Sequence, residues 1–331
     1  MKPARRTHLP AKTDALAAAP IQEAVAVLKR GGLVAFPTET VYGLGADASN
    51  PTAVARIFEV KGRPTGHPVI VHIGEVGQLE QWAREVPEAA WKLAARFWPG
   101  PLTLVLMRAR GVGNGLTGGQ DTIGIRIPRH PIALELLRQF HGGIAAPSAN
   151  RFGRISPTRA EHVREDLGSE VDVVLDGGRC EIGIESTIVD LSRGMPILLR
   201  PGRIGADDIA ATLGVSLRPR GPGTPRVPGA LRSHYAPHRP LSVIASEEWE
   251  RALRLRSRNS AVLSFRPRPL GDSHPMWIQA PSGAPYEYAH GLYANLRALD
   301  LSGCDEILVE APPQTEEWAA IRDRLARARS S

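Results

Sequence analysis

Hydroxyl, carboxylate and aromatic side chains gather in residues 37–45, which read P-T-E-T-V-Y-G-L-G and follow the apolar run 33–36. The threonines and the glutamate can bind a polar ligand, and the two glycines allow a close approach of the backbone. The functional interpretation is the rim of a pocket. An ordinary turn after a strand is the alternative, and the segment taken alone favours it.

Basic residues and histidines follow in residues 61–72. Lys61 and Arg63 flank a glycine before Pro64, an arrangement that could hold phosphate oxygens. Basic residues at the end of a helix would also complement its dipole, so both interpretations stay open. Further along stand His67 and His72, and a lone histidine such as His72 is more typical of a partly buried side chain than of a ligand.

An arginine stands in the otherwise apolar run I-G-I-R-I-P. Thr122 and Arg126 are four residues apart and therefore share one face of a strand. A buried arginine needs an anionic partner. A substrate carboxylate and a structural Asp or Glu are equally good candidates.

Three further segments place small polar side chains or arginine at the ends of short apolar runs: 146–150 with 156–158, 183–187, and 200–202. Ser156 or Thr158 could cap a helix that starts near Arg159. Together these segments predict a cleft for a small ligand with several phosphate or carboxylate oxygens. The common phosphate-loop, dinucleotide, serine-hydrolase and zinc-protease motifs are all absent from the sequence.

The elements that must position these residues alternate between helices and strands, which predicts an α/β fold with a twisted mixed sheet and flanking helices. A basic tail (1–20), a catalytic domain (21–217), a linker rich in Pro, Gly and Arg (218–240) and a small Rossmann-like α/β domain (241–331) are expected. Helices are predicted over 21–30, 52–61, 82–97, after Pro131, and around Arg251, Tyr293 and Ile321. Strands are predicted over 33–36, 69–73, 102–106, 123–127, 144–146, 171–175, 187–191, 197–199, 241–245, 261–265 and 306–309.

Composition limits the functional class of these 331 residues. No apolar run is long enough to span a membrane, and two distant cysteines make neither a disulfide framework nor a zinc site, so we expect a cytoplasmic protein. The formal charge is +7, but the excess lies in residues 1–12 and 218–240, which contain no acidic residue. The nearly neutral remainder argues against a surface that coats RNA, and the linker arginines are expected beside a nucleotide.

The motifs, taken in order, resemble those of the YrdC-domain family. The linker and the last domain resemble the two-domain form of that family, the threonylcarbamoyl-AMP synthases. The similarity extends from about residue 21 to near the C-terminus. It rests on these segments: P-T-E-T-V-Y-G-L-G, K-G-R-P, P-V-I-V-H-I, F-W-P-G-P-L-T, I-G-I-R-I-P, A-P-S-A-N, G-I-E-S-T-I-V-D, L-R-P-G and P-G-A-L-R-S-H-Y-A-P.

The resemblance implies a nucleotidyltransferase that condenses L-threonine, bicarbonate and ATP, with Mg²⁺ carried on the ATP phosphates and no metal ligand from the protein. The product would pass to a transferase that modifies adenosine 37 of tRNA. No side chain is assigned a catalytic role, and no covalent enzyme intermediate is expected, because positioning and charge neutralisation should dominate. The resemblance implies a threonine site of Thr40, His72, Arg126, Ala146 and Ser186, and an ATP site of Lys61, Arg63, His67, Thr122, Ser148, Asn150, Ser156, Arg200 and Tyr235.

The sequence departs from the family pattern at three places. Val227 stands where the linker motif usually has serine, Phe152 replaces a small polar residue, and residues 321–324 read I-R-D-R where the family has an Asn-Asp-Arg type of stretch. We expect the linker to fold over the cleft as a lid, with Tyr235 near ATP.

Two alternative functions, RNA binding and a different adenylate chemistry, fit the sequence less well. A module that binds tRNA or double-stranded RNA would need a broad basic face with stacking aromatics, but only 5% of the residues are aromatic, so at most weak RNA binding is expected. Carbamoyl-adenylate chemistry like that of hydrogenase-maturation relatives would need a much longer chain with zinc-finger cysteines.

Overall fold

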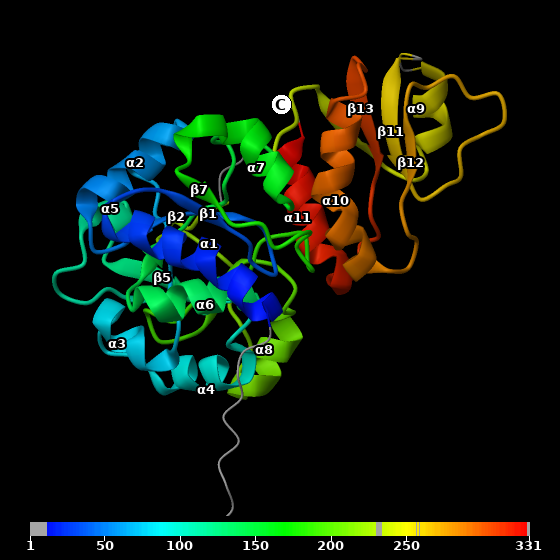
Figure 1. Cartoon of the computed structure of the whole chain (residues 1–331). Helices are drawn as coiled ribbons and strands as arrows, with labels where there is room; N and C mark the ends of the chain where they lie inside the picture. Colours follow the sequence, from blue (N-terminus) through cyan, green and yellow to red (C-terminus); the bar gives the residue numbers. More distant parts are fainter. Residues whose placement is uncertain (1–11, 230–233, 256, 258, 330–331) are drawn as a thin grey trace, which may run out of the picture.

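The computed structural model describes residues 12–229, 234–255, 257 and 259–329. Two α/β domains lie side by side, each built on its own sheet, with α7, α10 and α11 at their junction (Figure 1). The predicted fold class is confirmed, because the large sheet is mixed and the small one is entirely parallel.

The first domain contains a nine-stranded sheet in the order β7-β1-β2-β6-β3-β5-β4-β8-β9. The pairs β1–β7, β3–β5 and β4–β8 are parallel, and the other neighbours are antiparallel. The strands are β1 (Val34–Phe36), β2 (Gly43–Asp47), β3 (Ile70–His72), β4 (Leu102–Met107), β5 (Thr122–Arg126), β6 (Ile144–Ala145), β7 (Val173–Val174), β8 (Thr187–Asp190) and β9 (Ile197–Arg200).

Alternating side chains give this sheet two different faces. Leu33 and Ala35 belong to the main core, whereas Val34 and Phe36 pack with α1 and α6 on the opposite face. The helices of this domain are α1 (Lys12–Lys29), α2 (Pro51–Lys61), η1 (Val76–Gln78), α3 (Leu79–Trp82), α4 (Glu88–Phe97), α5 (Asn114–Thr117), α6 (Pro131–Phe140), α7 (Ala160–Leu167), η2 (Gly168–Glu170) and α8 (Ala206–Leu213).

The ends of α2 follow directly from the sequence. The Asn50 side chain accepts hydrogen bonds from the Thr52 and Ala53 amides, and the helix ends at Gly62 with φ of 61°. This end directs the chain from Lys61 toward Arg63, two of the predicted phosphate-binding residues.

The structure corrects several predicted boundaries. The helix expected over 82–97 is divided into α3 and α4, since residues 83–87 are not helical and Pro87 lacks the amide needed to continue a helix. Helix α1 begins at Lys12, inside the expected tail. The elements β2, β12, α5 and α8 were not predicted; β2 contains two glycines, which disfavour strands.

The second domain has four parallel strands in the order β10-β13-β11-β12. Among its described residues, the linker contains no helix or strand. The elements of this domain are β10 (Leu241–Ile244), α9 (Trp249–Leu255), β11 (Ser260–Ser264), β12 (Trp277–Gln279), α10 (Pro285–Asp300), β13 (Glu306–Glu310), η3 (Glu316–Trp318) and α11 (Ala319–Ala328).

Apolar side chains of both domains form one buried cluster at the junction. Val41 and Ile184 of the first domain pack in the same cluster as Tyr288 and Leu292 of α10 and Trp318 of η3. None of the helices in the described part of the chain is long and apolar enough to cross a membrane.

Candidate functional site

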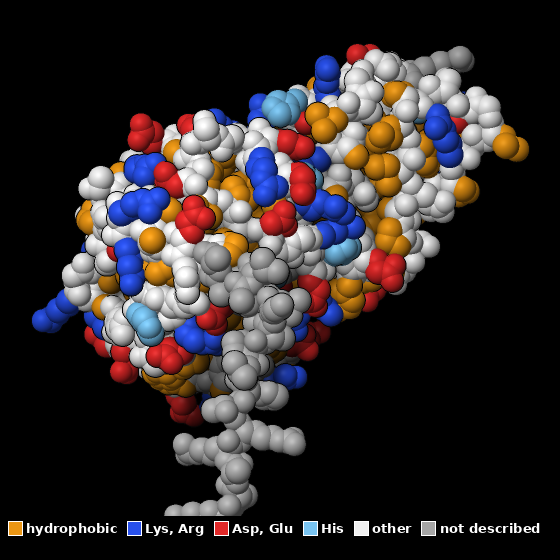
Figure 2. Space-filling model, in the orientation of Figure 1, with side chains coloured by type: hydrophobic (Ala, Val, Ile, Leu, Met, Phe, Trp, Pro, Cys, Tyr) orange, Lys and Arg blue, Asp and Glu red, His pale blue; other side chains and the backbone are white. Residues whose placement is uncertain are grey.

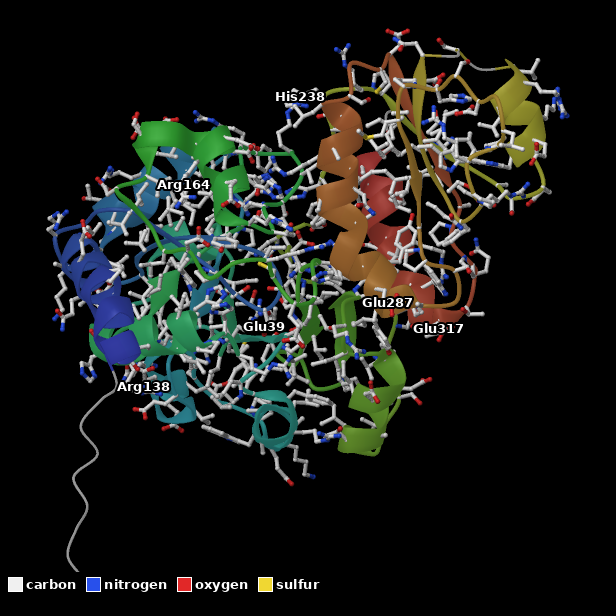
Figure 3. All side chains as sticks on the ribbon, turned by 45° about the vertical axis from the view of Figure 1, so that its right-hand side comes forward. Glu39, Arg138, Arg164, His238, Glu287 and Glu317 are labelled. Carbon is white, nitrogen blue, oxygen red and sulfur yellow. The ribbon has the colours of Figure 1, made fainter. Side chains whose placement is uncertain are left out.

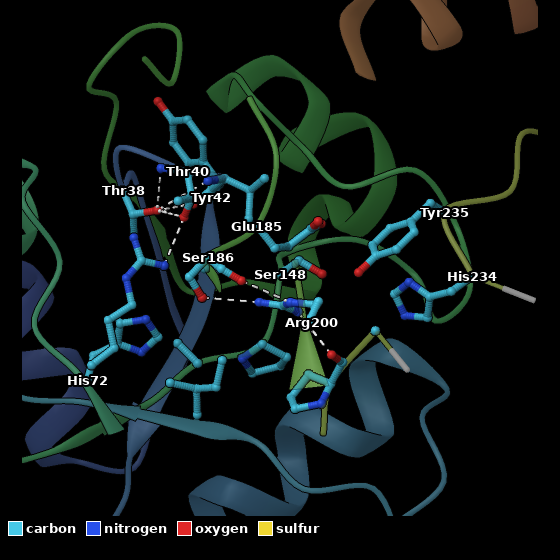
Figure 4. Close-up of a pocket in the computed structure, with 18 of the residues that line it drawn as sticks. Thr38, Thr40, Tyr42, His72, Ser148, Glu185, Ser186, Arg200, His234 and Tyr235 are labelled. Atoms are coloured by element: carbon cyan, nitrogen blue, oxygen red, sulfur yellow. Dashed lines mark hydrogen bonds between the residues drawn. The ribbon is translucent and has the colours of Figure 1, made fainter. Parts of the chain in front are cut away.

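A polar cavity of about 50 Å³ lies between the sheet of the first domain and the linker (Figure 4). Its floor is the part of the α1–α6 face of the sheet that these two helices leave uncovered, where Ile70 and His72 of β3 lie beside Gly124 and Arg126 of β5. The segment after β1, the end of β6, residues 185–186 and the end of β9 form its walls, and the linker closes it.

The structure brings most of the predicted binding residues to this cavity. All five residues predicted to bind threonine line it: Thr40, His72, Arg126, Ala146 and Ser186. Of the residues predicted to bind ATP, four line it: Arg63, Ser148, Arg200 and Tyr235. Their assignment to one ligand or the other stays a prediction.

The other five predicted ATP residues lie next to the cavity or behind it. Lys61 donates hydrogen bonds to the carbonyl oxygens of Ser148 (2.6 Å) and Asn150, and burial followed by the Arg63 charge holds its pKa well below the usual range. Lys61 therefore holds the 148–150 segment in place. The Asn150 amide donates to the carbonyl oxygens of Arg151 and Arg154, and Ser156 donates to Glu185.

Thr122 and His67 lie near the linker. Thr122 lines a small adjoining hollow with Arg226 and Pro228. The His67 ring lies 5.5 Å from the Phe152 ring, which is 6.0 Å from the His234 ring. Phe152, one of the departures from the family pattern, thus connects the two histidines.

The two interpretations of residues 37–45 are both correct. The Thr38 hydroxyl closes a turn by donating to the Val41 carbonyl and accepting from the Thr40 and Val41 amides. That turn places Thr40 and Tyr42 in the cavity wall, where Figure 4 shows them.

Arg126 has a structural anionic partner. Its Nη2 lies 2.7 Å from the Glu39 carboxylate, and both side chains are at most 4% exposed. Arg126 also donates to the Thr40 hydroxyl and the Gly100 carbonyl. The structural carboxylate that the sequence left open is therefore Glu39, which lies inside the first domain (Figure 3), and it compensates the charge that Arg126 carries into the cavity wall.

Arg200 is held by the backbone on both sides of the cavity. Its guanidinium donates to the carbonyl and hydroxyl oxygens of Ser186 at 3.0 and 3.1 Å, and to the carbonyl of Pro228 in the linker at 2.9 Å. Arg200 thus connects the end of β9 to the linker.

A buried network joins this wall to the second domain. Glu185 accepts hydrogen bonds from Ser156, from Tyr293 of α10 and from Arg324 of α11, and Arg324 is completely buried. Burial alone would raise the pKa of Glu185, but the charges of Arg324 and Arg200 outweigh it and lower the pKa to about 2. Arg324, in the stretch whose role the sequence left in doubt, is therefore part of the site's support.

Two histidines of the cavity are neutral near pH 7. Burial, followed by the Arg126 charge, lowers the pKa of His72 to about 3. Burial also lowers the pKa of His234 to about 3. The positive charge of the cavity wall therefore comes from arginine.

Apart from Arg126 Nη2, which is ion-paired with Glu39, four buried polar atoms of cavity-lining residues have no hydrogen-bond partner among the described residues. They are Arg63 Nε, His72 Nδ1, His234 Nδ1 and Tyr235 Oη. Because buried polar groups rarely stay unpaired, atoms gathered around one cavity indicate that a polar ligand completes their bonding.

The linker lies over the cavity as expected, but its arginines do not line it. Pro228, Gly229, His234 and Tyr235 are linker residues that line it, whereas no linker arginine in the described part of the chain does so. Arg226 instead lies near His67, whose pKa is lowered by burial and then by the charges of Arg63 and Arg226. Arg232 lies outside the described residues.

Four residues that support the site were not predicted from the sequence: Glu39, Glu185, Tyr293 and Arg324. Glu39 lies in the segment P-T-E-T-V-Y-G-L-G and Glu185 in G-I-E-S-T-I-V-D. An acidic residue inside such a segment is a signal that a buried arginine could have its partner there. Tyr293 and Arg324 come from the second domain, and nothing in their local sequence indicates a contact more than 100 residues away.

The carboxylates of this region are already paired, which bears on Mg²⁺. Glu185 is the acidic residue of the cavity lining, and it is bonded to Arg324, Tyr293 and Ser156. Within the described residues, no group of three or more His, Cys, Asp or Glu side chains could hold a metal ion. Entry of Mg²⁺ on the phosphates of ATP stays a prediction.

Comparisons with known proteins agree with this architecture. Residues 26–202 match the Sua5–YciO–YrdC family model, described as telomere recombination, and residues 204–330 match the model of the threonylcarbamoyl-AMP synthase C-terminal domain. The chain is 41% identical to the threonylcarbamoyl-AMP synthase of Pyrococcus abyssi over 93% of both chains. It is also 41% identical to that of Bacillus subtilis, over 93% of this chain and 92% of the relative.

A solved structure has the same arrangement. The crystal structure of P. abyssi Sua5 complexed with L-threonine matches with a TM-score of 0.84 and 39% identity over 93% of both chains. The chain belongs to the Sua5–YciO–YrdC family, in the form that has the threonylcarbamoyl-AMP synthase C-terminal domain.

Proposed function

We propose that this protein is a threonylcarbamoyl-AMP synthase, which condenses L-threonine, bicarbonate and ATP and releases pyrophosphate. The observation that carries the proposal is the cavity itself: arginines line it, and four buried polar atoms around it await partners. The proposal is also supported by the similarity of nearly the whole chain to proteins named threonylcarbamoyl-AMP synthase and to a solved Sua5 structure.

The reaction needs positioned charges more than reactive side chains. The threonine amine and bicarbonate give an N-carboxylate with loss of water; a carboxylate oxygen then attacks the α-phosphorus of ATP, and the bond to pyrophosphate breaks. Arg126, oriented by Glu39 and Thr40, would hold the threonine carboxylate. Arg63 and Arg200 would stabilise the charge that develops on the phosphates.

The linker would exclude water during this reaction. Bicarbonate addition and phosphoryl transfer both suffer from competing water, and Pro228, Gly229 and Tyr235 close the cavity on the side opposite the sheet. The ATP would arrive as its Mg²⁺ complex. We expect the product to pass to a tRNA-modifying transferase, and a cytoplasmic site of action remains a prediction.

The decisive experiment incubates the purified protein with MgATP, bicarbonate and L-threonine and measures pyrophosphate. Release is expected only when all three substrates are present, and mass spectrometry should find the threonylcarbamoyl adenylate. Equal release with serine, or no release with threonine, would contradict the proposal. Trapping an adenylated or carbamoylated side chain would contradict the absence of a covalent intermediate.

Direct RNA binding is the weaker alternative. Basic and acidic side chains alternate over the face seen in Figure 2, which has no continuous basic area. Such a mixed surface is poor at neutralising a phosphate backbone. We therefore expect only weak, salt-sensitive tRNA or double-stranded RNA binding.

A further inference from the structure

The upstream part of the linker is held by a glutamine outside the cavity. The Gln120 side chain accepts a hydrogen bond from the Arg226 amide at 2.7 Å and donates one to the Arg226 carbonyl at 3.0 Å. One side-chain amide thus pairs with both backbone groups of one linker residue, as a neighbouring strand would.

The Arg226 side chain adds a third contact by donating to the Gly118 carbonyl at 2.7 Å. Gly118 itself has φ of 60° and lies so close to the Gly66 carbonyl that a Cβ would be 2.4 Å from it, so only glycine fits at the position that receives the Arg226 side chain.

The next linker residue, Val227, is buried against the part of the α1–α6 face of the sheet that these helices leave uncovered. It is 6% exposed and packs with Ile70, Val105, Ile188 and Leu199, which come from β3, β4, β8 and β9. Valine thus completes an apolar cluster where the family pattern has a serine, and this chain holds its linker partly by apolar burial.

These contacts determine where the cavity-closing residues lie. Directly after Val227, the Pro228 carbonyl accepts from Arg200, and Gly229, with φ of 75°, lies against the Tyr235 hydroxyl. A shift at Arg226 would therefore move Pro228 away from Arg200 and Gly229 away from Tyr235.

The linker must also move during catalysis. The cavity of about 50 Å³ is far below the roughly 300 Å³ or more of ligand-sized pockets, so ATP does not fit inside it while the described linker residues keep this position. A linker that opens and closes needs one fixed end to return to the same position.

We propose that Gln120 and Val227 are positioning residues that fix this end of the linker, so that Pro228, Gly229 and Tyr235 return to the cavity in register. Neither side chain lines the cavity. Thr122, predicted to bind ATP, lines the hollow beneath Arg226 and Val227, so the effect should fall on ATP more than on threonine.

The test compares Gln120→Ala, Gln120→Glu and Val227→Thr. The alanine variant loses both hydrogen bonds, the glutamate variant keeps the acceptor but turns an anion toward the Arg226 carbonyl, and threonine keeps the shape of valine while placing a hydroxyl in the apolar cluster. Gln139→Ala is the matched control, because the Gln139 amide bonds Glu135 on the surface of α6.

Two measurements report on the proposal. Hydrogen exchange of the peptide around Arg226, and trypsin cleavage after Arg226, should accelerate about tenfold in the alanine and threonine variants and less in the glutamate variant, with β5 unchanged. The KM for ATP should rise about tenfold while the KM for threonine changes less.

The kinetic measurement rests on the proposed function, but the exchange and cleavage measurements do not. Inactive wild-type protein with accelerated linker exchange in the variants would refute the function and support the linker contact. Unchanged exchange and cleavage, or ATP and threonine KM values that rise equally, would overturn the proposal.

Discussion

Arg126 shows how one residue can serve structure and binding together. Its charge is compensated by Glu39, two further donors reach Thr40 and Gly100, and two of its five N–H groups stay available to a ligand. Arg126→Lys keeps a charge but loses the planar fork, so the KM for threonine should rise about ten- to a hundredfold. Arg129→Ala is the control, since the Arg129 side chain pairs with the exposed Glu181. Equal KM values in Arg126→Lys and wild type would remove Arg126 from the threonine site.

The buried neutral histidines make stability depend on pH. The folded pKa of His72, about 3, lies below the usual histidine pKa of about 6.5, so the unfolded chain binds the proton more tightly. This contribution to stability is complete above about pH 6.5 and is lost as the pH falls toward 3, by about 1.4 kcal/mol per pH unit. Urea unfolding at several pH values across that window measures the free energy of unfolding. Its slope against pH should be shallower for His72→Asn than for wild type.

Within the linker, Gly229 packs closely against the Tyr235 side chain. Gly229 has φ of 75°, and a Cβ there would lie 2.1 Å from the Tyr235 hydroxyl and 3.1 Å from Arg200 Nη1. Gly229→Ala should therefore displace Tyr235 and lower kcat/KM at least tenfold. Gly223→Ala is a matched control in the same linker, because Gly223 has φ of 76° but open space around it. If both variants lose the same activity, backbone strain rather than the Tyr235 contact is responsible.

Elements with a local signal could be predicted, and those that depend on distant partners could not. Helix α2 was predicted because Asn50, Pro51 and Gly62 mark its ends within the sequence itself. Strand β2 was missed because its two glycines have no strand preference and are kept by close packing: a Cβ on Gly45 would lie 2.8 Å from Ile144 and Phe36.

The same distinction holds for the site. Most of the predicted binding residues that stand at strand ends line the cavity. This could be predicted because the ends of neighbouring strands lie close together in a sheet. Lys61, Asn150 and Ser156, whose contact with ATP stays a prediction, bond protein groups that shape the wall. Sequence motifs do not separate residues that touch a ligand from residues that hold those residues, because both sets lie in the same segments.

At the scale of the whole molecule, the second domain stabilises the cavity wall through one buried ion pair. Arg324→Met would leave the buried Glu185 carboxylate without its cation, so the free energy of unfolding should fall by about 3–5 kcal/mol and the pKa of Glu185 should rise. The double variant Glu185→Gln with Arg324→Met removes both charges and should recover a large part of that loss.

Arg322→Met on the same helix provides the control, because Arg322 bonds the exposed Pro313 and Thr315 carbonyls. Urea unfolding followed by fluorescence checks stability, and the KM for ATP checks the cavity. The second domain acts on the cavity through charge if the double variant regains stability and keeps a raised KM, since Ser156, Tyr235 and Tyr293 all adjoin this pair. A single Arg324→Met variant as stable and active as Arg322→Met would instead mean that the Arg324–Glu185 pair contributes little to the junction, where Arg297 of α10 also pairs with Asp166 of α7.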